Sequence, residues 1–160
     1  MIMPADKLNE SEADGSADDG REHSPVNSTE AIERGLAGKT IAMVGLSSKA
    51  TSPSLAVATY LQSQGYRIIP VNPSETSVLG EKAYPALGDI PERVDVVDVF
   101  RRAEQTPAIA REAAEIGAGV LWLQLGIANH EAARIAGEAG LTVVMNRCMK
   151  VEHTARHPHS

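Results

Sequence analysis

The sequence has little of what marks secreted, membrane-spanning or nucleic-acid-binding proteins. Cys148 is the only cysteine among 160 residues, so no internal disulfide can form and a cytoplasmic location is expected. No apolar run reaches the length that spans a membrane, and we expect no membrane partner. Aromatic residues amount to only 3%, so the core must be built from alanine, valine, isoleucine and leucine.

The net negative charge of the chain comes entirely from its first 38 residues. Residues 1–38 hold nine of the 21 acidic residues and three of the 15 basic ones, whereas the remainder is neutral. A neutral domain has no basic field for nucleic acid, which we exclude as a partner. Because the first part has few large apolar residues, we expect residues 1–35 to be a disordered acidic segment. Residues 36–153 then form one folded domain, and residues 154–160 a polar tail.

Apolar runs typical of β-strands recur along the folded part. Most are continuous rather than alternating, as in parallel strands that helices cover on both faces. The intervals between them leave room for crossover helices, which are expected to open at Ser52-Pro53, Thr106-Pro107 and Asn129. We therefore predict an α/β fold: a single domain with a Rossmann-like, doubly wound, five-stranded parallel sheet. The predicted strands are Thr40–Val44, Arg67–Val71, Val94–Phe100, Gly119–Leu123 and Leu141–Val144.

The turn after the first predicted strand is typical of an anion site. An apolar run ends at Gly45, a polar loop of Leu46-Ser47-Ser48-Lys49 follows, and a helix is expected from Pro53. Backbone N–H groups in such a turn, together with the helix dipole, favour a phosphate. The dinucleotide pattern G-x-G-x-x-G is absent, because its second and third glycines are missing.

The other strand ends narrow the ligand class. NAD-binding domains place Asp or Glu after the second strand, where this chain has Asn72-Pro73. An uncharged residue there favours a ligand with a phosphate on or near its ribose; coenzyme A fits, and NADP is not excluded. Basic residues follow several strand ends and suit phosphate oxygens. They are Lys49, Arg101, Arg102, Arg147 and Lys150.

These strand ends carry a family resemblance. The chain from about Leu36 to His153 resembles the small, stand-alone CoA-binding-domain proteins, which are similar to the nucleotide-binding domain of the succinyl-CoA synthetase α subunit. The matching stretches are residues 39–47, 65–73, 96–102, 122–127 and 146–153. The resemblance implies that Gly45, Ser47 and the following loop hold phosphate, that Asn72-Pro73 and Val99-Phe100-Arg101 line the nucleotide, and that Asn146-Arg147 closes the site. The family often has Asp where Asn146 stands. The candidate binding residues are Gly45, Ser47, Ser48, Lys49, Pro53, Asn72, Pro73, Val99, Phe100, Arg101, Asn146 and Arg147.

No catalytic or metal site is predicted. Cys148 has basic neighbours that could activate a thiol, but a lone cysteine is more often a small core residue. A mixed disulfide between Cys148 and the CoA thiol is a separate hypothesis. His153, His157 and His159 are expected in the polar tail, and Asp98 falls inside a strand as a structural hydrogen-bond acceptor.

We therefore expect a non-catalytic protein that binds coenzyme A or acyl-CoA as a carrier, sensor or accessory module. A partner ligase or self-association would fit this role. The alternatives are an NAD(P)-binding redox sensor or oxidoreductase domain, and an interaction module with a vestigial pocket.

Overall fold

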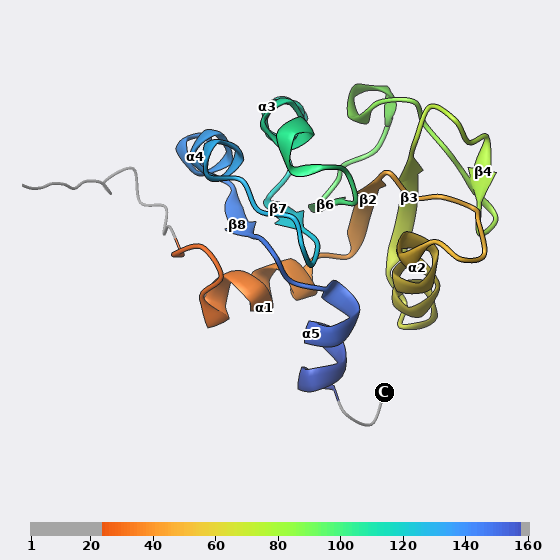
Figure 1. The fold of residues 1–160 in the computed structure, drawn as a ribbon, viewed down its shortest axis with the longest axis horizontal. Helices are drawn as coiled ribbons and strands as arrows, with labels where there is room; N and C mark the ends of the chain where they lie inside the picture. Colours follow the sequence, from red (N-terminus) through yellow and green to blue (C-terminus); the bar gives the residue numbers. More distant parts are fainter. Residues whose placement is uncertain (1–23, 158–160) are drawn as a thin grey trace, which may run out of the picture.

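The computed structural model describes residues 24–157, which form one five-stranded sheet with helices on both faces (Figure 1). The strand order is β3-β2-β6-β7-β8, and every neighbouring pair is parallel. This confirms the predicted Rossmann-like fold. The strands are β2 (Thr40–Val44), β3 (Arg67–Val71), β6 (Val96–Val99), β7 (Val120–Leu123) and β8 (Thr142–Val144).

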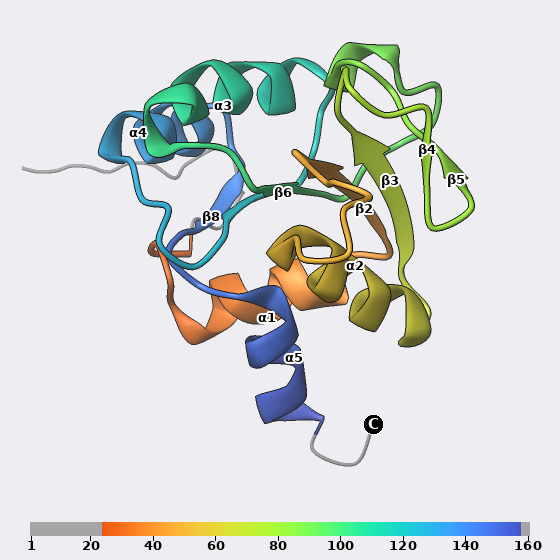
Figure 2. The same cartoon turned by 45° about the vertical axis from the view of Figure 1, so that its right-hand side comes forward.

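The continuous apolar runs are explained by burial on two sides. One cluster of buried aliphatic residues packs under α3 (Thr106–Glu115) and α4 (His130–Glu138). The second packs against α1 (Thr29–Ala37), α2 (Pro53–Ser63) and α5 (Met149–Arg156). Figure 2 shows the two helical layers above and below the sheet. Alternate residues of each strand point into opposite clusters, so a polar side chain within a strand needs a specific hydrogen-bond partner.

Most element boundaries agree with the predictions. Ser52 caps α2 by accepting from the Ser54 N–H, and Asn129 caps α4 by accepting from the Ala132 N–H. The third strand is shorter than predicted, since Val94 precedes β6 and Phe100 follows it. Between β3 and β6 lie a small hairpin of β4 (Ser77–Val78) and β5 (Glu81–Lys82) and a 3-10 turn, η2 (Leu87–Asp89). A second 3-10 turn, η3 (Ala103–Gln105), leads into α3.

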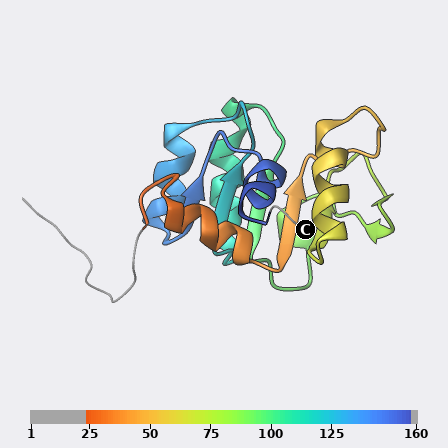
Figure 3. The same ribbon diagram turned by 90° about the horizontal axis from the view of Figure 1, so that it is seen from below.

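The expectation of a disordered segment reaching residue 35 is wrong for residues 29–35, which belong to α1. Ser28 caps this helix, and Ile32 and Leu36 are buried in the core. A Cβ built on Gly35 would lie 2.6 Å from the ring of Trp122, so only glycine allows this close packing. In Figure 3, where the molecule is seen from below, α1 runs across the face of the sheet. Residues 1–23 lie outside the described residues.

The expected polar tail begins later than predicted, because α5 continues to Arg156. His153 is buried on α5, where its Nδ1 lies 2.7 Å from the Tyr60 hydroxyl of α2. Burial, together with the charge of the neighbouring His157, lowers the pKa of His153. His153 is therefore part of the packing between α5 and α2, and residues 158–160 lie outside the described residues.

Candidate functional site

A cleft of about 520 Å³ lies at the carboxyl ends of β2, β6 and β7. The start of α2 forms one wall, and the segment after β6 forms the other. Both predicted residues after β6, Phe100 and Arg101, line this cleft, as do Gly45 and Pro53. The remaining lining residues are Ser52, Ser54, Arg102, Ala103, Glu104, Gly126 and Ile127.

A second, smaller hollow of about 210 Å³ shares Arg101 with the cleft. Its walls are mainly apolar and proline-rich: Val44, Val71, Pro73, Pro85, Ala86 and Ile109, with Gln105 and Glu112. Among the described residues Arg101 makes no ion pair, whereas its neighbour Arg102 pairs with Glu104 at 3.6 Å. Arg101, which has no ion-pair partner among the described residues, thus lines both the cleft and the smaller, mainly apolar hollow.

Gly45 allows the two strand ends to approach each other. Its φ of +90° is unfavourable for other residues, and an added Cβ would lie 2.6 Å from the Phe100 carbonyl oxygen. The Phe100 N–H donates to the Val44 carbonyl at 2.8 Å, which fixes this approach. Glycine is therefore required at position 45 by both its backbone conformation and its packing against Phe100.

The loop after Gly45 differs from the simple phosphate cradle that the sequence predicts. The N–H of Ser47 donates to Ser54 Oγ at 3.1 Å, and that of Lys49 to Ser47 Oγ at 3.1 Å. The N–H of Ser48 donates to Glu75 Oε2 at 2.8 Å. Three successive backbone donors are thus satisfied by protein oxygens, and the three residues lie beside the cleft rather than in its lining.

Two predicted contact residues point away from the cleft. The side chain of Val99 is buried, because it lies on the face of the sheet that α3 and α4 cover. Asn72 is also buried: its Nδ2 donates to the Leu46 carbonyl at 3.0 Å, and its Oδ1 accepts from the Ser74 N–H at 2.9 Å. Neither side chain lines the cleft or the smaller hollow, in contrast to what the resemblance implies, and Asn72 joins the loops after β2 and β3.

Asn146 and Arg147 also act behind the cleft. Asn146 has a φ of +60°, and its Oδ1 accepts from the Gly126 N–H at 2.7 Å. The Arg147 carbonyl accepts from Trp122 Nε1 at 2.9 Å. Asn146 therefore holds the loop of Gly126 and Ile127 in place, whereas Arg147 is bonded to β7; neither residue lines the cleft.

A buried carboxyl group lies beneath the ends of β6 and β7. Asp98 is fully buried, and its Oδ1 accepts from Gln124 Nε2 at 2.6 Å, whereas its Oδ2 has no partner among the described residues. Burial raises the pKa of Asp98 from 3.8 to about 7, against the opposing effects of Gln124 and the Val99 backbone. The acid form is therefore favoured in the fold up to neutral pH.

Several lining residues were missed by reasoning from strand ends alone. Glu104 and Gln105 belong to η3, and Ile109 and Glu112 belong to the first turns of α3, in the segment that follows β6. The Ser52-Pro53 cap was a usable signal for Ser54, whose hydroxyl lies 2.6 Å from that of Ser52. Pro73, a predicted site residue, lines the smaller hollow together with Pro85, for which there was no comparable signal.

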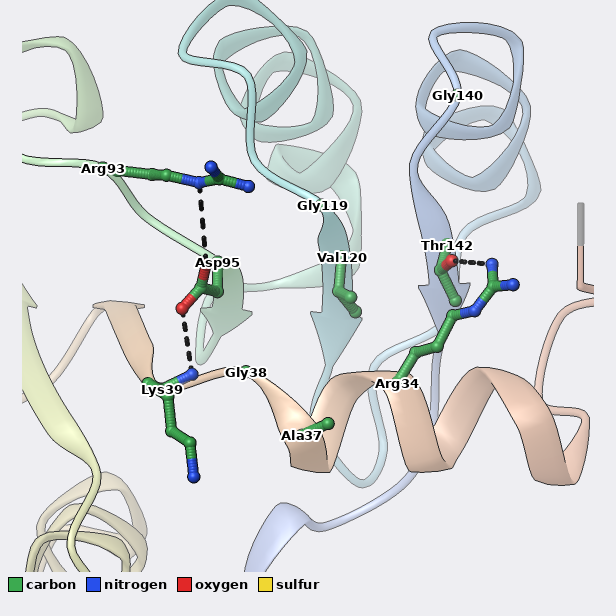
Figure 4. Close-up of a pocket in the computed structure, with 10 residues that line it drawn as sticks. All are labelled: Arg34, Ala37, Gly38, Lys39, Arg93, Asp95, Gly119, Val120, Gly140 and Thr142. Carbon is green, nitrogen blue, oxygen red and sulfur yellow. Dashed lines mark hydrogen bonds and ion pairs between the residues drawn. The ribbon is translucent and has the colours of Figure 1, made fainter. Parts of the chain in front are cut away.

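A larger hollow, about 660 Å³, opens at the opposite edge of the sheet, where β2, β7 and β8 begin (Figure 4). Its one carboxylate, Asp95, already accepts from the N–H groups of Lys39 and Thr40 at 2.9 and 3.0 Å. Arg34 likewise donates to Thr142 Oγ1 at 3.4 Å. Ligands of doubly wound sheets bind at the carboxyl ends of the strands, so we assign the site to the cleft.

Other reactive groups lie outside the cleft. Cys148 is half-buried at the start of α5 and packs against the second core cluster. Within residues 24–157, no three His, Cys, Asp or Glu side chains gather closely enough to hold a metal ion. None of the helices described is long and apolar enough to cross a membrane.

Comparisons with known proteins identify the family to which the chain is similar. The family described as "CoA binding domain" matches residues 39–154. Uncharacterized protein YneT of Bacillus subtilis is 46% identical over 115 residues, which are 72% of this chain and 85% of YneT. A solved hypothetical protein of Pyrococcus horikoshii superimposes with a TM-score of 0.77 at 40% identity, covering 84% of this chain and 97% of that one. The acetate–CoA ligase (ADP-forming) II of Archaeoglobus fulgidus is 32% identical over 81 residues, 49% of this chain but only 12% of the ligase.

Proposed function

The chain belongs to the CoA-binding domain family, and from this premise we propose that it binds coenzyme A or an acyl-CoA through the nucleotide phosphates. The observation that carries the proposal is the position of Arg101 between the two hollows. Coenzyme A has a flat base at one end, phosphates in the middle and a long arm. The smaller apolar hollow suits the base, Arg101 suits a phosphate, and the larger cleft suits the arm.

We propose further that the bound molecule is carried or sensed rather than converted. The polar groups that line the cleft are serines, two arginines and Glu104, and the nucleophile Cys148 is absent from the lining. The match to 12% of an acetate–CoA ligase supports an accessory role beside a partner ligase. Incubation with acetyl-CoA tests this: appearance of free CoA thiol at a rate above buffer would contradict a non-catalytic role.

Calorimetric titration with CoA, acetyl-CoA, NAD and NADP tests the ligand. We expect CoA to bind and Arg101→Ala to weaken it by about 1.5–3 kcal/mol, or roughly 10- to 150-fold, because a charge-assisted contact is lost. Arg111→Ala is the matched control, since Arg111 lies on the exposed face of α3 and lines neither hollow. Tight NAD binding without CoA binding would favour the dinucleotide alternative.

A further inference from the structure

Glu75 places an anion on the loop that the sequence assigns to phosphate. Both of its carboxylate oxygens contact Ser48: Oε2 accepts from the backbone N–H at 2.8 Å, and the hydroxyl lies 2.9 Å from Oε1 and 3.0 Å from Oε2. Carboxylate and phosphate oxygens take the same donors with similar geometry. The loop after β2 therefore binds an anion in this structure, and the anion is a side chain of the chain itself.

The turn that follows β3 holds the Glu75 carboxylate against Ser48. Residues 72–75 form a turn, in which the Glu75 N–H donates to the Asn72 carbonyl at 3.2 Å. The Asn72 side chain bonds at one end to this turn, through Ser74, and at the other to the Leu46 carbonyl. Asn72 thus fixes the distance between the two loops and keeps the Glu75 carboxylate opposite Ser48.

We infer that Glu75 is a built-in competitor for the ligand phosphate and sets the affinity of the site. A phosphate that takes the Ser48 donors must displace the carboxylate, because two anions cannot share them at about 3 Å without strong repulsion. The measured association constant is then the intrinsic constant multiplied by the fraction of molecules in which Glu75 does not occupy Ser48. The inference deepens the proposed function and rests on it for the identity of the ligand.

Glu75→Gln removes the charge and keeps the size of the side chain. Glu81→Gln is the matched control: Glu81 lies on the neighbouring hairpin, pairs with Arg67 at 3.0 Å and lines neither hollow. Thermal unfolding of both variants checks that the fold is retained. The first probe is inorganic diphosphate, titrated at constant ionic strength while the Ser48 amide is followed by NMR.

We expect the Ser48 amide to shift in Glu75→Gln without ligand, because its acceptor has lost its charge. Diphosphate should then move this amide at concentrations about tenfold lower in Glu75→Gln than in the wild type or in Glu81→Gln. The proposal is overturned if the Ser48 amide is unchanged by the substitution, or if diphosphate acts equally, or not at all, on both proteins.

Titration with CoA separates this inference from the proposed function. Binding about tenfold tighter to Glu75→Gln supports both. Equal affinities for the wild type and Glu75→Gln overturn the role of Glu75 but leave CoA binding intact. If no variant binds CoA while the diphosphate result holds, CoA is the wrong ligand, and Glu75 still competes with an anion at Ser48.

Discussion

Substitution of Asp98 by asparagine should change how the stability of the protein depends on pH. The pKa of Asp98 is about 7 in the fold and 3.8 for the unperturbed group, and its carboxyl is fully buried. This difference corresponds to about 4 kcal/mol between the fully protonated and fully ionised limits. Because the folded protein binds this proton more tightly than the unfolded chain, the free energy of unfolding falls as pH rises from about 4 to 7. Above pH 7 the group contributes no further change.

Asparagine cannot titrate, yet its Oδ1 can still accept from Gln124. The free energy of unfolding of the wild type minus that of Asp98→Asn should therefore fall by about 4 kcal/mol between pH 4 and pH 8. Urea unfolding of both proteins at matched pH values measures it, since other titrating groups cancel in the subtraction. A difference that stays constant within about 0.5 kcal/mol would refute the reasoning, because Asp98 would then titrate alike in both states.

Three further predictions test the packing of the site and its surroundings. Gly45→Ala should lower the free energy of unfolding by about 1–3 kcal/mol through its backbone conformation alone, and by more through the clash with the Phe100 carbonyl. Chemical denaturation measures the total loss, and a variant as stable as the wild type would contradict the assigned geometry. Ile32→Ala should cost about 2–5 kcal/mol in the same assay, whereas the exposed Glu33→Ala should cost little; equal effects would mean that α1 does not pack as described. The half-buried thiol of Cys148 should react with a disulfide reagent at a rate that CoA alters, and equally slow reaction with and without CoA would end the mixed-disulfide hypothesis.

The sheet could be predicted because burial on both faces leaves a direct trace in the sequence. Residues 41–44 of β2, for example, are all apolar and buried, and the intervals between such runs are long enough for a crossover helix. Helix α1 left a weaker trace: two large apolar residues in an acidic stretch. It packs against residues far away in the sequence, such as Trp122, whose ring lies against Gly35, and such pairing cannot be read from local composition.

The candidate site was predictable as a place but not as a set of contacts. The rule that ligands bind at the carboxyl ends of parallel strands led to Gly45, Phe100 and Arg101, and all three line the cleft. It gives no side-chain directions, so it also included Val99, which points into the core. The same rule cannot show that Asn72 uses its amide within the protein, because that depends on how two loops meet.

Because the Asn72 amide is used within the protein, the side chain near β3 that can distinguish coenzyme A from a dinucleotide is Glu75. The absence of an acid directly after β3 was the reason to disfavour NAD, yet Glu75 lies three residues further on and reaches back to the loop after β2. A dinucleotide ribose would recruit such a carboxylate through its hydroxyls, whereas a phosphate must expel it. The same Glu75→Gln substitution should then weaken NAD binding and strengthen CoA binding. Opposite shifts in two calorimetric titrations would identify the carboxylate as the group that selects between them, and parallel shifts would show that it does not.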